Sequence, residues 1–468
     1  MKRRFIVPFA ALAVFFITAC SSDYNSLIRE SENRFNKGEF LEAARTLLPQ
    51  VNTADKNQLL FMMEAGLMLH AGGEYEKSTT VLTGAAKLVE EMPIRVTQQA
   101  AALLLNERST NYRGEDHERV LVHMYLGLNR LMMKDGEGAR VDFKKTNDYL
   151  RELVQKGGRA YKQNIMAKYL TGIAFEITAD ADNDESDREF AYIEYKQIQS
   201  LSRNLPMVYF DLQRVARAMN DAEDFRQWVG ISGTNHLRNI PKGGGEFVLV
   251  FQSGQGAVKV SRGPLMSDRT MANGIRVAMN GLRGQQALAA SAIMISLNKA
   301  ENPIPKFQKR GSRVQYCEII VNDQKYGRSF MLENIEDTAV KNLEEDYTRI
   351  VGQAAAGIVT KVAVAVVAGI ATRKAMEQNQ RLGPWAGLAG ALVGAGTGAA
   401  LISQIKPDLR CWHSLPANLQ MGRMYLPPGE HLLTINLIDR SGGVVNTVER
   451  KVTIESGKRN FFNLRTLF

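Results

Sequence analysis

Two nine-residue stretches of similar sequence, 35 residues apart, constrain the fold of this chain more than any other feature. Phe35–Ala43 and His70–Ser78 each place a glycine, Gly38 or Gly73, before a glutamate and an aromatic residue. Glycine permits a tight turn because it adopts positive φ at little cost. The aromatic residue then packs back on the preceding helix, and the small residue three positions later lets two helices approach closely. The pattern predicts a recurring helix–turn–helix unit.

The same plan extends over residues 24 to about 235. Apolar residues recur there at spacings of three and four, proline is rare, and short polar or glycine-containing turns separate the segments. We expect further, less regular pairs in 120–150, 161–201 and 207–229. The period resembles that of the tetratricopeptide repeat (TPR), which implies stacked helix pairs with a concave binding surface. A non-repetitive helical bundle is the alternative.

The composition changes at Pro241–Gly245, and strand and turn signals dominate much of the second half of the chain. We predict three hairpins, formed by 246–252 with 257–261, 314–321 with 328–332, and 429–438 with 444–454. The fold class is therefore α+β, with an N-terminal α-solenoid and a β-rich, sandwich-like domain. The predicted boundaries are 20–240 for the helical repeats, 241–350 and 406–468 for the two parts of the β-rich domain, and 351–405 for an insert between them.

The insert has an unusual composition. Val351–Ala371 is rich in Ala, Val and Gly, and 383–405 has no charge, so both approach the about 20 residues that cross a bilayer core. Gly390, Gly394 and Gly398 recur every four residues, which places them on one helix face where another backbone can approach. This resembles the glycine zipper of some outer-membrane-associated lipoproteins and pore-forming assemblies. Two interpretations stay open: a helical hairpin that packs within a soluble protein or self-associates, and one that enters a membrane.

The N-terminus predicts export. A basic stretch precedes an apolar one, and Ala19 lies just before the expected cleavage point. Ile17–Cys20 resembles the lipobox of bacterial lipoproteins. The resemblance implies that residues 1–19 are a removed signal peptide and that Cys20 carries acyl chains such as palmitate, which anchor a protein without a spanning helix. Ser21 stands where an inner-membrane retention signal places Asp, which favours the outer membrane and a periplasmic location.

The remaining cysteines, Cys317 and Cys411, would both lie in the oxidising periplasm, where disulfides persist. A bridge between them would close a long loop and contribute about 2–4 kcal/mol to stability. Cys317 also lies in an apolar, strand-like stretch, 314–321, where a buried free thiol is common. We predict the disulfide, with two free thiols as the alternative.

Candidate catalytic and metal-binding motifs are incomplete. Asp180, Asp182 and Asp184 mimic the first ligands of a calcium loop, but the central Gly and final Glu are missing, which favours a helix-capping turn. Cys411 and His413 suggest a thiol–imidazole pair, but we expect neighbouring strand residues to point to opposite faces. No Cys or His cluster has zinc-ligand spacing. We expect no enzyme, no cofactor and, because the net charge of +10 is dispersed, no nucleic-acid partner.

The most distinctive part of the second half is formed by Arg410–Gln420 and Leu426–His431. Together with the lipobox, the helix pairs and the insert, it resembles a largely uncharacterised family of bacterial envelope lipoproteins. The resemblance covers nearly the whole chain and brings no catalytic residues. It implies a scaffold or adaptor that holds a protein or peptide partner in its groove. An oligomeric or membrane-inserting assembly component is the alternative, and cell-wall binding by the β-rich domain is a third hypothesis.

Overall fold

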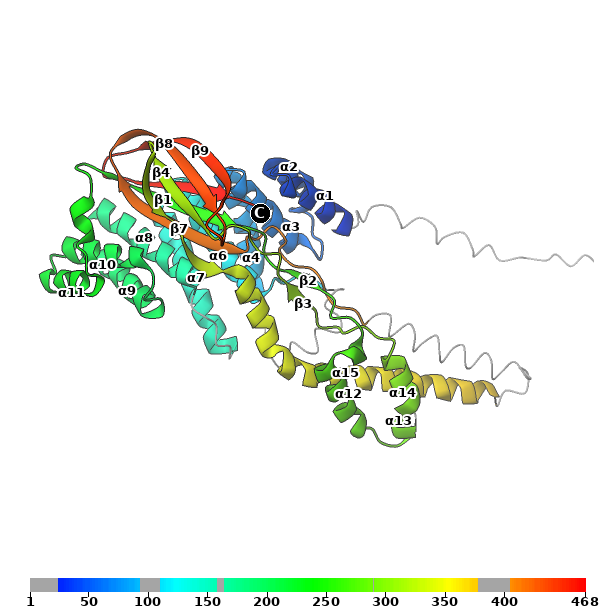
Figure 1. Cartoon of the computed structure of the whole chain (residues 1–468). Helices are drawn as coiled ribbons and strands as arrows, with labels where there is room; N and C mark the ends of the chain where they lie inside the picture. Colours follow the sequence, from blue (N-terminus) through cyan, green and yellow to red (C-terminus); the bar gives the residue numbers. More distant parts are fainter. Residues whose placement is uncertain (1–23, 93–109, 158–163, 289, 378–404) are drawn as a thin grey trace, which may run out of the picture.

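Helix pairs make up the first half of the chain (Figure 1). The structure, a computed structural model, describes residues 24–92, 110–157, 164–288, 290–377 and 405–468. Residues 1–19, which we predict to be a signal peptide, and Cys20 lie outside the described residues. The described pairs are α1 (Tyr24–Asn36) with α2 (Phe40–Leu47), α3 (Gln58–Ala71) with α4 (Tyr75–Glu91), α6 (Asp116–Met132) with α7 (Gly136–Gly157), α8 (Ile165–Asp182) with α9 (Glu185–Leu201), and α10 (Pro206–Ala218) with α11 (Ala222–Ser232).

The five turns within these pairs have the same construction. The residue at the bend has positive φ, and the N–H of the acidic residue after it donates to the carbonyl five residues back. The bend residues are Gly38 (80°), Gly73 (83°), Lys134 (63°), Asn183 (51°) and Asn220 (56°). The acidic residues are Glu39, Glu74, Asp135, Asp184 and Asp221. This geometry confirms the TPR-like region, and it shows that the later units keep the turn although they have lost the glycine.

The roles predicted for the aromatic and small residues are also confirmed. The Phe40 ring lies 5.2 Å from that of Phe35, and the Tyr75 ring lies 5.5 Å from that of His70. Ser78 is fully buried, and its hydroxyl donates to the Gly66 carbonyl of the preceding helix. Each aromatic residue therefore packs on the helix before it, and the small residue marks the point where the two helices cross.

Replacing Gly73 with alanine should lower the free energy of unfolding by about 1–2 kcal/mol, the usual cost of left-handed backbone for an L-residue. The loss would come from the backbone, because no atom lies within 4 Å of the position that a Cβ would take. Gly230→Ala is the matched control, since Gly230 has the same open space but lies inside α11. Alanine there should stabilise by up to about 1 kcal/mol. Losses of equal size in urea unfolding would contradict the prediction.

Two four-stranded sheets pack face to face in the second half. Their orders are β10-β1-β7-β6 and β5-β4-β8-β9. The strands of the first sheet are β1 (Gly245–Ser253), β6 (Phe330–Asn334), β7 (Asn418–Leu426) and β10 (Arg459–Arg465). Those of the second are β4 (Tyr316–Val321), β5 (Gln324–Arg328), β8 (Gly429–Ile438) and β9 (Val444–Ile454). In the first sheet, β1 pairs in parallel with β10 and antiparallel with β7.

The central strand β1 is buried on both faces. Phe247, Leu249 and Phe251 pack against the second sheet, whereas Val248 and Val250 pack against the helices. The molecule is therefore built in three layers: helix pairs, first sheet and second sheet (Figure 1).

The three predicted hairpins fare differently. The one formed by β8 and β9 is confirmed. The first is wrong, because β2 (Val258–Val260) leaves the sheet and pairs with β3 (Lys306–Gln308) while β1 is flanked by β7 and β10. The second is right in its first strand only. β4 pairs with β5 across a turn in which Asn322 and Asp323 have positive φ, and β6 crosses to the other sheet.

The predicted disulfide is not formed: Cys317 and Cys411 are both free and buried. Cys317 points into the apolar layer between the two sheets. Cys411 packs in a separate cluster with Ala257 and Phe307. The two thiols belong to different cores, because the extended segment that carries Cys411 lies against the helices.

A helical arm extends away from the sandwich, and its helices come from two parts of the chain, one between β2 and β3 and the other between β6 and β7 (Figure 1). It consists of α12 (Arg269–Asn280), α13 (Gln285–Leu288), α14 (Ala290–Leu297) and the 43-residue helix α15 (Ile335–Glu377), and these four helices are called the arm. The shorter helices pack on α15 through an apolar cluster of their own. Short 3₁₀ turns at Leu48–Gln50, His236–Asn239 and Leu265–Ser267 complete the described helices.

The arm corrects two predicted boundaries. Its long helix begins at Ile335 and not at Val351, and the stretch 269–297, which we placed in the β-rich domain, is helical. Gly390, Gly394 and Gly398 lie outside the described residues. The segment Tyr347–Ala371 of α15 is long and apolar enough to cross a membrane, and 47% of its most apolar stretch is buried within the molecule.

Candidate functional site

The inner face of the helix pairs, where the sequence predicts a binding groove, is filled by the chain itself. The first helices of the pairs share one apolar core with Val248 and Val250 of β1, with Leu419 and Met421 of β7, and with Trp412. Trp412 is only 1% exposed, and its ring lies 5.9 Å from that of Tyr125. The predicted helix pairs are therefore present, but their concave face is not open to a partner.

The distinctive stretch around Trp412 is an extended segment held by two buried carboxylates of the helices. The N–H of Trp412 donates to Glu118 of α6 over 2.7 Å. The next two N–H groups, of His413 and Ser414, donate to the two oxygens of Glu64 over 2.5 and 3.1 Å. Carboxylates that accept from consecutive backbone N–H groups form strong, charge-assisted hydrogen bonds. The segment thus occupies the groove as a bound peptide would.

Burial changes the titration of both carboxylates. It raises the pKa of Glu64 to about 7, although His413 and the N–H donors act in the opposite direction. Burial also raises the pKa of Glu118, and the neighbouring Glu115 adds to the effect. For Glu64 the available sequence signal was a single carboxylate in an otherwise apolar helix, whereas Glu118 lies in a charged first turn beside Asp116 and Arg119 and gave no such signal. Our sequence analysis assigned a role to neither.

A second contact between helices and sandwich is made by buried charges. Arg423 of β7 is 3% exposed, and it pairs with Asp211 of α10 over 2.7 Å and with Glu176 of α8 over 3.3 Å. It also binds Glu246 of β1. Arg214 of α10 donates to both oxygens of Glu176. These charges connect two helices to two strands, so they fix the orientation of the sandwich on the solenoid.

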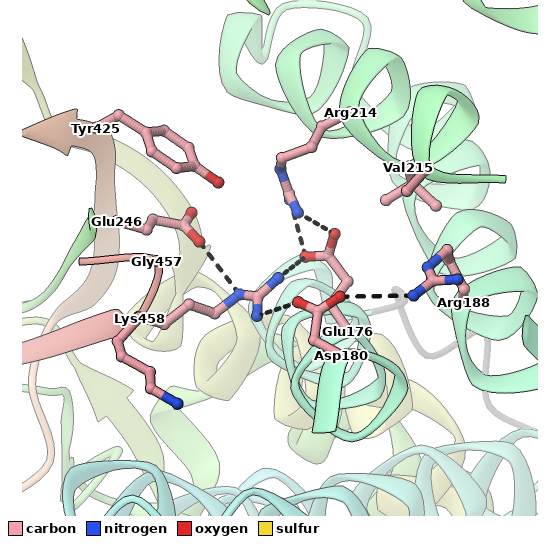
Figure 2. A pocket seen from close by; sticks show the side chains of 11 residues that line it. Glu176, Asp180, Arg188, Arg214, Val215, Glu246, Tyr425, Gly457 and Lys458 are labelled. Carbon is pink, nitrogen blue, oxygen red and sulfur yellow. Dashed lines mark hydrogen bonds and ion pairs between the residues drawn. The ribbon is translucent and has the colours of Figure 1, made fainter. Parts of the chain in front are cut away.

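A pocket of about 180 Å³ opens beside this ionic cluster (Figure 2). Figure 2 shows Arg214 reaching from its helix toward Glu176, with Glu246 on the sandwich side. Burial alone would raise the pKa of Glu176, but Arg214 and two further guanidinium groups hold it at about 2. Glu176 is consequently ionised at neutral pH, and Glu176, Asp211 and Glu246 each have a guanidinium partner. This geometry indicates a structural role, in which the cluster holds the helices and the sandwich together.

A neutral histidine forms a third link. His70 Nδ1 lies 2.6 Å from the Asn129 side-chain oxygen, and its Nε2 lies 2.8 Å from the Gln252 side-chain nitrogen. One ring nitrogen therefore donates and the other accepts, which requires the neutral imidazole. Burial agrees with this state, since it lowers the pKa of His70 to about 4. The Tyr125 hydroxyl donates to the same Gln252, so α3, α6 and β1 share one polar network.

The remaining sequence candidates have structural roles. Asp184 caps α9 by accepting from the Ser186 N–H, as predicted for a capping turn. Cys411 and His413 lie on the same side of their segment, contrary to our expectation, because residues two apart in an extended chain share a face. His413 lies close to Cys411 and hydrogen-bonds Glu32 of α1 over 2.7 Å. The thiol is only 1% exposed, so this cluster ties α1 to the segment.

The arm exposes apolar surface that the body does not cover. Val277 of α12 is 73% exposed and Ile295 of α14 is 63% exposed. On α15, Val364 and Ile370 are 57% and 41% exposed. The same region carries exposed cations that make no ion pair within the described part of the chain, namely Arg269, Arg276, Arg283 and Lys299. Exposed apolar side chains beside unpaired positive charge are typical of a surface that binds another molecule with complementary negative charge.

Comparison with known proteins finds no family model and no curated protein that matches this chain. Among solved structures, the helical half is similar to MamA from Desulfovibrio magneticus RS-1, with 15% identity and a TM-score of 0.32. That match covers 46% of this chain and 99% of the other. A tetratricopeptide repeat protein from Parabacteroides merdae is also similar, with 16% identity, a TM-score of 0.17, and coverage of 46% and 95%.

Proposed function

We propose that this protein is a lipid-anchored scaffold of the bacterial envelope, held at the outer membrane through Cys20 and facing the periplasm. The observation that carries the proposal is a difference between two of its surfaces. The concave face of the helix pairs is closed by the chain's own first sheet and the Trp412 segment, whereas the arm presents exposed apolar side chains. The arm is therefore the surface that binds a protein partner.

The chemistry of the arm suggests the kind of partner. Val277 and Ile295 are flanked by the exposed cations Arg276 and Lys299. Such a surface suits a protein that offers an apolar patch with an acidic rim, because complementary charge steers association and fixes its register.

A photoreactive amino acid at Val277 or Ile295 tests the arm in intact cells. We expect one discrete protein adduct at either position, and none at Val444, which is 57% exposed on the sandwich. Arg276→Glu with Lys299→Glu should abolish the adduct, whereas Arg440→Glu with Lys451→Glu, which changes the same charge on the sandwich, should leave it intact. Equal labelling at Val444, or an adduct insensitive to the arm charges, would refute the assignment.

Membrane insertion is the second candidate function, and the apolar segment Tyr347–Ala371 favours it. Fractionation of a chain with a non-lipid signal and Cys20→Ser separates the two. Release into the soluble periplasm is expected if the acyl chains are the membrane anchor. Retention that resists salt and alkaline washing would instead show that the arm enters the bilayer.

A further inference from the structure

A pocket of about 460 Å³ lies between the first turns of α1 and the extended segment 406–413. Tyr24, Ile28 and Glu32 of α1 form one wall, and Pro407 and Leu409 belong to the opposite one. This volume is within the range that small-molecule ligands fill. The ionic cluster around Arg423 joins the helices to the sandwich, and none of its residues lines this pocket. The contact that this cluster makes therefore does not explain why the pocket has a charged lining.

The charges of the pocket divide into paired and unpaired groups. Several of the lining charges are paired: Arg410 with Asp408, His413 with Glu32, and Lys259 with Glu115. Glu301 adds an acidic residue to the lining. Three exposed cations make no ion pair with any described residue, namely Arg29, Lys56 and Lys406. Positive charge is therefore in excess in the lining of the pocket.

One hydrogen-bond donor in the lining has no acceptor. The Tyr24 hydroxyl is buried and makes no hydrogen bond with the described residues, although its ring packs 5.8 Å from that of Phe61. Burial raises the pKa of Tyr24 well above its usual value, with Cys411 and Glu64 adding to the effect, so the group keeps its proton and can donate. A buried donor without a partner costs about 1–3 kcal/mol, which a ligand oxygen would relieve. Unpaired cations and an unsatisfied hydroxyl donor therefore line one pocket.

We propose that this pocket binds a phosphate ester, with the oxyanion held by Arg29, Lys56, Lys406 and the Tyr24 hydroxyl and the organic part against Ile28 and Leu409. The ester belongs either to a phospholipid headgroup or to a soluble compound. Tyr24 follows Cys20 by four positions, and a chain of that length reaches at most about 14 Å. The phospholipid source rests on the proposed lipid anchor, whereas the phosphate chemistry of the pocket does not.

Calorimetric titration of the mature chain with Cys20→Ser tests the site. The probes are glycerol 3-phosphate and dihexanoyl-phosphatidylglycerol below its micelle concentration. Saturable one-to-one binding of either probe supports the proposal. Binding of the lipid alone identifies a headgroup site, and equal binding of both identifies a site for soluble esters. Absence of saturable binding for both probes overturns it.

Three variants make the test specific. Arg29→Gln with Lys56→Gln and Lys406→Gln should weaken binding at least tenfold, whereas Lys87→Gln with Arg440→Gln and Lys451→Gln, the same charge change elsewhere, should not. Tyr24→Phe should weaken binding several-fold without lowering the melting temperature, because the hydroxyl has no partner to lose. Equal losses in the two triple variants, or unchanged affinity in both pocket variants, would overturn the proposal.

Discussion

Replacing Arg423 with methionine should lower the free energy of unfolding by about 3–5 kcal/mol, the usual effect of breaking a buried ion pair from one side. The methionine keeps most of the side-chain volume, so the loss reports the missing charge. Asp211, Glu176 and Glu246 would be left in a buried site with one guanidinium fewer. Urea unfolding followed by circular dichroism measures the change.

The matched control for Arg423 is Lys325→Met. Lys325 pairs with Glu318 at the surface, where its side chain is 62% exposed. Exposed ion pairs contribute between about 0 and 1 kcal/mol. A loss of less than about 1 kcal/mol for both variants would mean that the cluster does not hold the sandwich on the helices.

The second large effect concerns acid. His70, His117 and His123 each have a pKa lowered by burial to about 4, against 6.5 for the free side chain. The unfolded chain therefore takes up protons at these sites before the folded one. Each histidine contributes about 3 kcal/mol of stability that is present above pH 6.5 and is lost as the pH falls toward 4. Stability should drop steeply over this interval.

Glu64 works in the opposite direction. Its pKa of about 7 lies above the ordinary 4.5, so it binds a proton more tightly in the folded state. Acidification from pH 7 to 4.5 therefore raises the free energy of unfolding by about 3 kcal/mol through this residue. The net acid loss of the protein should therefore be smaller than the sum over the three histidines.

His70→Gln isolates one of these contributions, because glutamine keeps a donor and an acceptor but does not titrate. The difference in unfolding free energy between pH 6.5 and pH 4 should shrink by about 3 kcal/mol relative to the unaltered protein. His431→Gln is the control, since His431 lies at the surface of the second sheet beside Asn322. The same pH slope in all three proteins would show that His70 is not held neutral.

The helix pairs could be predicted from the sequence because their signals are local. Apolar spacing placed three helix pairs in 120–150, 161–201 and 207–229, where α6 with α7, α8 with α9 and α10 with α11 are found, and Gly38 and Gly73 marked two of the turns. The third hairpin was equally local, since a short glycine-containing turn separates β8 from β9. Interactions within one or two turns of chain leave a pattern that one sequence displays.

The filled groove could not be predicted, because it depends on contacts between residues far apart in the chain. Nothing near Glu64 indicates that its carboxylate binds the N–H groups of residues 413 and 414. Two warning signs were nevertheless present. α3 is apolar on all sides, and Phe247–Phe251 is an unbroken apolar run, which are patterns of elements covered on every face. Both imply that something lies against the inner helices.

The parallel pairing of β1 with β10 has a consequence for how the protein is made. Val248 pairs with Phe461, so the hydrogen bonds on one edge of the central strand form only after β10 has been synthesised. The helix pairs are synthesised first, with the inner apolar face that the sheet will later cover still exposed. Such a late closing contact slows folding and lengthens exposure to aggregation. Under the export that we propose, we therefore expect biogenesis of this protein to depend on a periplasmic chaperone that shields the helices until β10 is available.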